Sequence, residues 1–165
     1  MGADADADDG NDSLSLERQV CFALAVANRA VLAVYRPVLE PLGLTHPQYL
    51  VMLSLWDHDR RPGGDHTAPS VKVIAERLQL DSATLSPMLK RLEAQGLIDR
   101  ARRQGDERTM EVRLTEEGRR LRDKALAVPP AVVARLGTDI SELEELRDVL
   151  SRINAAALAA GALES

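Results

Sequence analysis

The sequence predicts a mainly α-helical fold with one small β-hairpin. Apolar residues recur at three- and four-residue steps through most of the chain, whereas a short stretch before residue 115 alternates with a period of two. With 165 residues, 45% of them apolar, the chain is long enough for one domain with a buried core. Its single cysteine cannot form an internal disulfide, which favours a reducing compartment and predicts a cytoplasmic protein. No apolar run approaches the roughly 18 residues of a membrane span, so no membrane partner is expected.

The N-terminal third is predicted to be an acidic tail followed by two helices. The first dozen residues hold five Asp and almost nothing to bury, so residues 1–13 are predicted to be a disordered tail. The apolar spacing then predicts a helix over residues 14–37, closed by the "YRP" at its end, and a second helix that Thr45 caps. We therefore expect residues 14–56 to form N-terminal helices for dimerisation, and these helices carry all four aromatic residues of the chain.

Residues 57–70 are predicted to form a loop, because two Pro and two Gly occur there among mixed charges. Two Asp-His pairs in this stretch raise the alternative of a metal site. They lack the fixed helical spacing that metal geometry favours, so we predict neither a metal nor a cofactor.

Residues 71–94 are predicted to form two short helices joined by a tight turn. Asp81 or Ser82 is placed to cap the second helix, and Gly96 is placed to end it. Apolar positions of both helices should face the core, namely Val71, Ile74, Ala75, Leu78, Leu85, Met88, Leu89 and Leu92. The opposite side of the second helix carries small hydroxyls and bases, which suit an element that enters the major groove: Ser82, Thr84, Ser86, Lys90 and Arg91. Helix pairs of this kind also occur in proteins that never contact DNA.

The next stretch predicts a hairpin with a basic tip around a Gly-Asp turn. On its second limb Met110, Val112 and Leu114 should face one way, and Thr109, Glu111 and Arg113 the other. Arginines cluster around the turn, at positions 100, 102, 103 and 108, and Asp106 is close enough in sequence to orient the last of them. A helix pair followed by such a hairpin predicts a winged helix-turn-helix over residues 71–115, whose wing arginine reaches the minor groove. The wing residues expected to contact DNA are Arg103, Asp106 and Arg108.

The net charge of −5 is unevenly distributed, which answers the objection that an acidic protein should avoid DNA. Residues 90–122 hold ten Lys and Arg against seven Asp and Glu, whereas the remainder holds eleven against nineteen. Binding to phosphate needs local positive charge rather than a basic protein. The alternative is that these arginines are simply solvated.

Residues 116–165 are predicted to form C-terminal dimerisation helices. A helix should begin at Thr115 and be broken by Pro129 and Pro130, and a last helix should begin near Ile140. These helices and the first one are longer and more apolar than one small winged domain requires. We therefore expect a homodimer that presents two recognition helices to a palindromic operator in double-stranded DNA.

Three segments resemble a known family. "DSATLSPMLKRLEAQGLIDRARRQGDERTMEVRLTEEG" (residues 81–118) is similar to the recognition helix and wing of the MarR-type transcriptional regulators. "RQVCFAL" (residues 18–24) and "YRPVLEPLGLTHPQYLVMLSLW" (residues 35–56) resemble its organic hydroperoxide-sensing branch, the OhrR repressors. The resemblance covers residues 14–155. It implies a dimeric MarR-like architecture and a repressor, not an enzyme, that an organic hydroperoxide releases from DNA.

The same resemblance implies a redox site. Cys21 matches the reactive cysteine of the branch, and Tyr35 matches the tyrosine that holds its thiolate across the dimer interface. His46 stands where many members have a tyrosine before "PQYL", so its imidazole would add pH dependence; Tyr49 of that motif completes the expected set. The residues agree with this, because Cys21 lies near a helix start and Tyr35 follows fourteen positions later, too far for contact within one straight helix.

The oxidised cysteine has two expected fates, because the chain has no second cysteine to resolve it and would belong to the one-cysteine type. One is a mixed disulfide with a low-molecular-weight thiol, and the other is a cyclic sulfenamide. Three alternatives to the sensor stay open. Cys21 could be a small apolar residue in a MarR-type repressor that a phenolic or other small ligand releases. A thiol peroxidase would lack its resolving thiol, and part of a larger enzyme would lack a glycine-rich cofactor loop.

Overall fold

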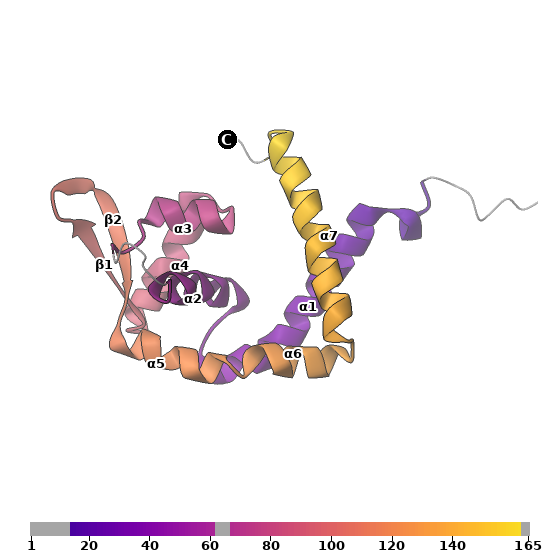
Figure 1. The fold of residues 1–165 in the computed structure, drawn as a ribbon, viewed down its shortest axis with the longest axis horizontal. Coiled ribbons are helices and arrows are strands. Elements are labelled where there is room, and N and C mark those ends of the chain that lie inside the picture. Colours follow the sequence, from indigo (N-terminus) through magenta and orange to yellow (C-terminus); the bar gives the residue numbers. More distant parts are fainter. Residues whose placement is uncertain (1–13, 62–66, 163–165) are drawn as a thin grey trace, which may run out of the picture.

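The computed structural model describes residues 14–61 and 67–162, so the predicted acidic tail and the middle of the predicted loop lie outside the described residues. Figure 1 shows a lobe of short helices and a hairpin on one side, and an arm of longer helices on the other. The elements are η1 (Leu16–Arg18), α1 (Val20–Leu39), η2 (Glu40–Leu42), α2 (His46–Asp59), α3 (Val71–Leu78), α4 (Ser82–Ala94), β1 (Ile98–Arg103), β2 (Asp106–Leu114), α5 (Glu116–Ala125), α6 (Val128–Leu136) and α7 (Ile140–Ala159). The predicted fold class, mainly α with a small hairpin, is confirmed.

Helix α1 differs from its prediction at both ends. It begins at Val20 after the short turn η1, rather than at Leu14, so Cys21 is its second residue. It also continues through Pro37 to Leu39. Proline lacks the N–H that would bond to the carbonyl four residues earlier, but one missing bond in the last turn does not end a helix that is already packed.

The expectation that no segment is long and apolar enough to span a membrane is wrong for α1. The helical segment Val20–Leu42 has 23 residues and is long and apolar enough, by length and composition alone, to cross a membrane. Only 6% of its most apolar window is buried in the single chain. A core helix of a water-soluble assembly meets the same criterion, because its apolar side faces a neighbour instead of lipid. No uninterrupted apolar run in the sequence reveals this segment, because Arg29 and Arg36 interrupt it.

Helix α2 forms the centre of the lobe. Thr45 caps it as expected, and its side chain and that of Gln48 bond to each other's backbone N–H in a reciprocal capping box. The helix extends to Asp59, so the first three residues of the predicted loop are helical. Trp56 donates from Nε1 to the carbonyl oxygen of Gly118 at 2.8 Å, which ties α2 to α5.

The two helices of the predicted turn motif are both present. Ser70 caps α3 and Asp81 caps α4, each accepting a bond from the backbone N–H three residues later. Gly96 follows the end of α4 with a left-handed φ of 71°, as predicted for a residue that ends this helix. The predicted inward side chains Leu85, Leu89 and Leu92 are fully buried, and Met88 is partly buried against the same core.

The hairpin pairs β1 with β2 in antiparallel register, from Ile98 opposite Leu114 to Arg103 opposite Asp106, with an irregularity beside Arg103. One side-chain direction was predicted wrongly. Glu111 was expected on the outward face but is only 2% exposed. The backbone that precedes α3 runs along β2, because the Val112 N–H donates to the Pro69 carbonyl at 3.0 Å and Ser70 bridges to Glu111. This extra segment pairs with the edge of β2 that a two-stranded hairpin would leave open.

The C-terminal region contains three helices rather than the two that were predicted. Helix α5 begins one residue later than predicted, because Thr115 caps it instead of forming its first residue. It ends at Ala125, and Pro129 and Pro130 lie in the first turn of a separate helix, α6. Proline is favoured there because the first helical N–H groups have no partner within the helix. The prolines therefore begin a helix instead of merely breaking one.

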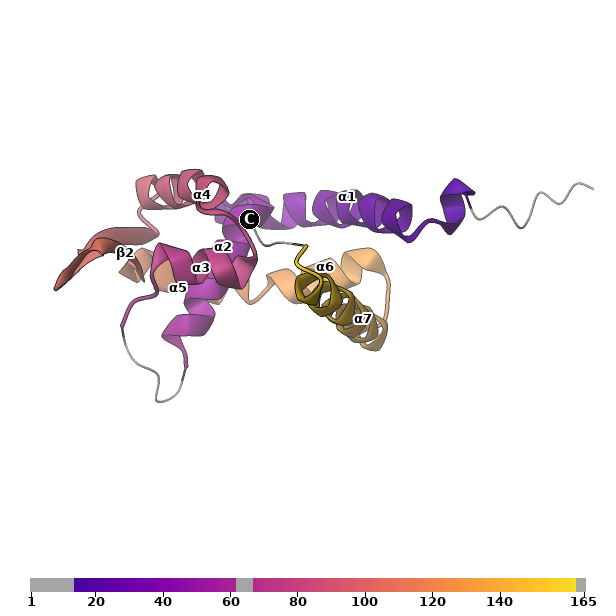
Figure 2. The ribbon, with the colours of Figure 1, turned by 90° about the horizontal axis from the view of Figure 1, so that it is seen from above.

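The arm exposes apolar side chains that a single copy leaves uncovered. No residue of α7 is buried, and α1 buries only Leu39. Both helices extend beyond the lobe in the two perpendicular views (Figures 1 and 2). The large exposed apolar residues of this surface are Leu16, Val20, Leu24, Val26, Ile140, Leu146, Val149, Leu150, Ile153 and Leu158. So many apolar side chains on one part of a surface mark an interaction site.

Candidate DNA-binding surface and redox site

The outward face of α4 carries the five residues predicted for the major groove. Ser82, Thr84, Lys90 and Arg91 are exposed, and Ser86 is half-buried. Two of the hydroxyls are held by their own helix: Thr84 donates to Asp81 at 2.9 Å, and Ser86 donates to the Ser82 carbonyl at 2.7 Å. Among the described residues, Lys90 and Arg91 take part in no ion pair. The helix thus offers two uncommitted positive charges and hydroxyl oxygens that can still accept hydrogen bonds.

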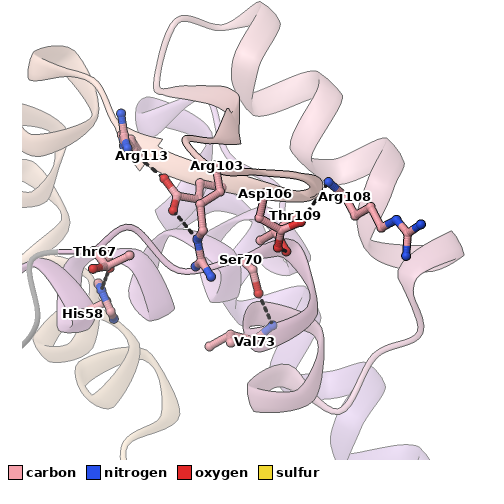
Figure 3. A network of polar contacts seen from close by, with 10 residues as sticks. His58, Thr67, Ser70, Val73, Arg103, Asp106, Arg108, Thr109 and Arg113 are labelled. Atoms are coloured by element: carbon pink, nitrogen blue, oxygen red, sulfur yellow. Dashed lines mark hydrogen bonds and ion pairs between the residues drawn. The ribbon is translucent and has the colours of Figure 1, made fainter.

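Asp106 organises the tip of the wing through the backbone. One carboxylate oxygen accepts the Arg108 backbone N–H at 3.1 Å, and the other accepts the Thr109 hydroxyl at 2.6 Å. The hydrogen bond from Thr109, followed by that from the backbone of Arg108, lowers the pKa of Asp106. Asp106 was expected to orient the Arg108 side chain. It fixes the turn instead, and the guanidinium extends away from it (Figure 3).

The other wing arginines bond to the protein itself. Arg100 makes a two-nitrogen contact with one oxygen of Glu93, at 3.0 and 2.5 Å. Arg103 donates to Glu111 at 2.7 Å, and Arg102 donates to the carbonyl of Glu107. Arg108 is the wing arginine whose guanidinium has no partner among the described residues. Sequence reasoning missed Glu93 and Glu111 as partners, since nothing local in the sequence predicts a pair that depends on how the hairpin folds back.

A cluster of rings connects the end of α1 to α2. Tyr35 of α1 packs edge to face on His46 with ring centroids 4.9 Å apart, and Tyr49 lies 6.2 Å from Tyr35. Trp56 continues the cluster 6.4 Å beyond Tyr49. Three of the four residues predicted for the redox site therefore lie together.

Burial sets the protonation of these rings. It raises the pKa of Tyr35 and of Tyr49, with a smaller contribution to Tyr49 from Tyr35, so both hydroxyls remain hydrogen-bond donors at neutral pH. Burial also lowers the pKa of His46 below its usual 6.5. The imidazole is therefore mainly neutral over the physiological range. The pH dependence expected of His46 therefore lies at a lower pH than that of a solvated imidazole.

Cys21 lies apart from the rings in the single chain. It is exposed at the start of α1, and Tyr35 is fourteen residues further along the same helix, about 21 Å at the usual rise per residue. A groove of about 850 Å³ opens beside the rings between the side chains of Leu32 and Arg36 on α1 and His46 and Leu50 on α2. Within the described ranges, no group of three or more His, Cys, Asp or Glu is placed to hold a metal ion.

Known proteins share this fold and much of this sequence. The family model described as transcriptional regulator SarA/Rot matches residues 33–125. The organic hydroperoxide resistance transcriptional regulator of Bacillus subtilis strain 168 is 40% identical over 139 residues, which is 84% of this chain and 89% of that protein.

Two solved structures are also similar. Reduced AbfR bound to DNA, a protein of Staphylococcus epidermidis, gives a TM-score of 0.70 at 32% identity, over 86% of this chain and 91% of that one. CouR from Rhodococcus jostii RHA1, bound to p-coumaroyl-CoA, gives a TM-score of 0.68 at 28% identity, over 86% and 95%.

The exposed α4 and the hairpin behind it, in a fold shared with DNA-bound relatives, define a DNA-binding protein of the winged helix-turn-helix class. The matched relatives are transcriptional regulators rather than enzymes. The chain belongs to the MarR family of transcriptional regulators, in the branch of the organic hydroperoxide resistance regulators.

Proposed function

We propose that this protein is a cytoplasmic transcriptional repressor that binds a palindromic operator as a homodimer and releases it when an organic hydroperoxide oxidises Cys21. The observation that carries this proposal is the position of Cys21 at the exposed end of α1, while Tyr35, His46 and Tyr49 gather at the other end. Two copies of α1 that run past each other in opposite directions would place each cysteine beside the rings of the partner.

The apolar surface of the arm supports this assembly. In a two-fold dimer the same patch of each copy covers the other, so the uncovered side chains of α1 and α7 would become core. The groove beside His46 leaves space for the start of the partner's α1. The same two-fold axis would present two copies of α4 to the two half-sites of a palindrome.

The chemistry at Cys21 is an oxidation by two electrons. In this dimer the tyrosine hydroxyls of the partner supply hydrogen-bond donors for the reacting sulfur. The thiolate sulfur attacks one oxygen of the hydroperoxide, a sulfur–oxygen bond forms, and the oxygen–oxygen bond breaks. The attacked oxygen is the terminal one, which keeps its proton, so the sulfur becomes a sulfenic acid directly. The alkoxide that leaves then takes one proton to become the alcohol.

The sulfenic acid then has two routes, because this chain contains no second cysteine. Condensation with a low-molecular-weight thiol forms a mixed disulfide and releases water, whereas condensation with a backbone nitrogen forms a cyclic sulfenamide and also releases water. Either product adds bulk or a constraint at a packed interface. A shift there changes the spacing of the two recognition helices and so weakens operator binding.

On the DNA side, α4 enters the major groove and the wing reaches the minor groove. The exposed charges of Lys90 and Arg91 and the free guanidinium of Arg108 support this arrangement. The proposed direct contacts are Ser82, Thr84, Ser86, Lys90, Arg91 and Arg108. Arg103 and Asp106, which were also expected at the DNA, are proposed to act by shaping the wing, through Glu111 and through the backbone of the tip.

A second candidate function is release by a small ligand, with Cys21 structural. CouR, a similar structure, is bound to p-coumaroyl-CoA, and the arm of this chain has a second apolar groove of about 610 Å³ between α1, α6 and α7. A phenolic or other apolar ligand of that kind would act without any oxidation.

One experiment separates the two candidates. An operator is first selected from a pool of random duplexes with the reduced protein, and its mobility shift is then measured with cumene hydroperoxide or with a panel of phenolic acids. The repressor proposal expects the peroxide to release DNA and a thiol reductant to restore binding. Release by a phenolic acid together with indifference to the peroxide would favour the ligand-controlled function.

A further inference from the structure

We propose that Glu111 is a positioning residue that fixes the wing at the angle from which Arg108 reaches DNA. This inference goes beyond the redox switch and rests only on the proposed wing contact of Arg108. Glu111 is one of the most buried polar residues of the described chain, yet it lies in the hairpin, close to the surface that meets DNA.

The Glu111 carboxylate joins both strands of the wing. Arg103 of β1 donates from Nε to one oxygen at 2.7 Å, and Arg113 of β2 donates to the other oxygen at 2.7 Å. Figure 3 labels Arg103 and Arg113 and marks these two contacts with dashed lines. Bonds to both oxygens hold the carboxylate in one orientation, and the hydrogen bond from Arg103 lowers its pKa, so it stays ionised at neutral pH.

The same residue joins the wing to the rest of the lobe. Its backbone bridges to Ser70, the residue that caps α3 by accepting the Val73 N–H at 3.2 Å. One residue earlier, the Pro69 carbonyl accepts the Val112 N–H, and a ring nitrogen of His58 at the end of α2 lies 3.0 Å from the Thr67 carbonyl oxygen. The hairpin is thus fastened to α2 and α3 through the segment that Glu111 faces.

A carboxylate in this place has no direct use for binding DNA, since a negative charge near phosphate weakens the complex. Its burial also costs free energy unless every oxygen is bonded. Both oxygens are bonded, and the partners are arginines that would otherwise be free to move. The arrangement is explained by what it holds in place, which is the middle of the hairpin whose tip carries Arg108.

The test compares two isosteric changes in the same strand. Glu111→Gln and Glu107→Gln each remove one negative charge, but Glu107 is exposed and its side chain bonds to none of the described residues. If only the loss of a negative charge mattered, both variants would bind DNA as tightly as the wild type or more tightly. Positioning predicts that Glu111→Gln binds a selected operator about three- to tenfold more weakly, while Glu107→Gln does not, by fluorescence anisotropy of the reduced full-length protein.

A double-mutant cycle with Arg108→Ala identifies the route of the effect. If Glu111 acts by placing Arg108, then Glu111→Gln loses most of its effect once Arg108 is already alanine. The same holds for Arg113→Gln, a second variant that removes one of the two holds and keeps the buried carboxylate. An equal loss in both Arg108 backgrounds would mean that Glu111 only stabilises the fold, and it would overturn the proposal. If Arg108→Ala weakens binding but Glu111→Gln and Arg113→Gln do not, only this inference fails; if Arg108→Ala has no effect, the proposed wing contact fails with it.

Discussion

Tyr35 and His46 meet edge to face at the junction of α1 and α2, with ring centroids 4.9 Å apart and ring planes inclined by 71°. The contact buries the imidazole, which lowers its pKa. A neutral ring can donate one hydrogen bond from one nitrogen without adding a charge to the site. His46 can therefore replace a tyrosine hydroxyl near neutral pH, and its difference from tyrosine should show only in acid.

The burial of His46 predicts an acid-sensitive fold. Its folded pKa lies below the unfolded value of about 6.5, so the unfolded chain binds more protons as the pH falls through that range. The free energy of unfolding should therefore decrease from pH 7.5 to pH 5.5, and by more in the wild type than in His46→Tyr. Urea denaturation at the two pH values measures this difference. Equal losses in the two proteins would show that His46 is not the residue responsible.

The apolar arm predicts the assembly state. Sedimentation at micromolar concentration without DNA should show a dimer, because one copy leaves α7 entirely unburied. Replacing Ile153, which is 45% exposed on that helix, by Glu should shift the equilibrium toward monomer. A stable, folded wild-type monomer would remove the proposed redox site, since Cys21 would have no rings to meet.

The tip of the wing predicts a specific loss of DNA affinity. Arg108→Ala should weaken operator binding by about 1 to 3 kcal/mol if the guanidinium enters the minor groove. Arg102→Ala is the matched control, because this arginine lies on the same hairpin but donates to the Glu107 carbonyl. Equal effects of the two changes at moderate salt would indicate that the wing contributes only general charge.

The contact between α5 and the start of the hairpin predicts a stability loss. A Cβ atom on Gly118 would lie 2.0 Å from the Leu97 carbonyl oxygen, and the Gly118 carbonyl already accepts the bond from Trp56. Gly118→Ala should therefore lower the free energy of unfolding by more than about 2 kcal/mol. Fluorescence of Trp56, the one tryptophan, reports the unfolding directly. Wild-type stability in this variant would contradict the close approach of the two segments.

Local signals in the sequence predicted the helices and the hairpin of the lobe. Thr45 was identified as a cap, Asp81 as one of two cap candidates with Ser82, and Gly96 as the end of a helix, because capping and left-handed turns depend on a few neighbouring residues. The inward face of α4 followed from helical periodicity for the same reason.

Features that depend on distant contacts were missed. The burial of Glu111 follows from the pairing of β2 with the segment before α3, some forty residues away in sequence, and alternation alone places that side chain outside. Pro129 was interpreted as a break, although it lies in the first turn of α6. The distance between Cys21 and Tyr35 could be anticipated from sequence, but the packing of Tyr35 on His46 needed the relative placement of two helices.

The central claim is that Cys21 controls release from DNA. Cys21→Ser nearly preserves the size of the side chain and removes the oxidisable sulfur, so the variant should fold, dimerise and bind the operator as the wild type does. Methionine oxidation is a confounder, because Met88 lies in α4 and Met110 in β2. A thiol reductant distinguishes the two, since it reverses a sulfenic acid or a mixed disulfide but not a methionine sulfoxide.

The most direct measurement is an operator mobility shift of wild type and Cys21→Ser with increasing organic hydroperoxide, with mass spectrometry of the released protein. We predict that the wild type dissociates, carries the added oxygen or thiol on Cys21, and rebinds after thiol reduction, while the serine variant stays bound. If the serine variant dissociates as readily as the wild type, Cys21 is structural and the sensor account is wrong.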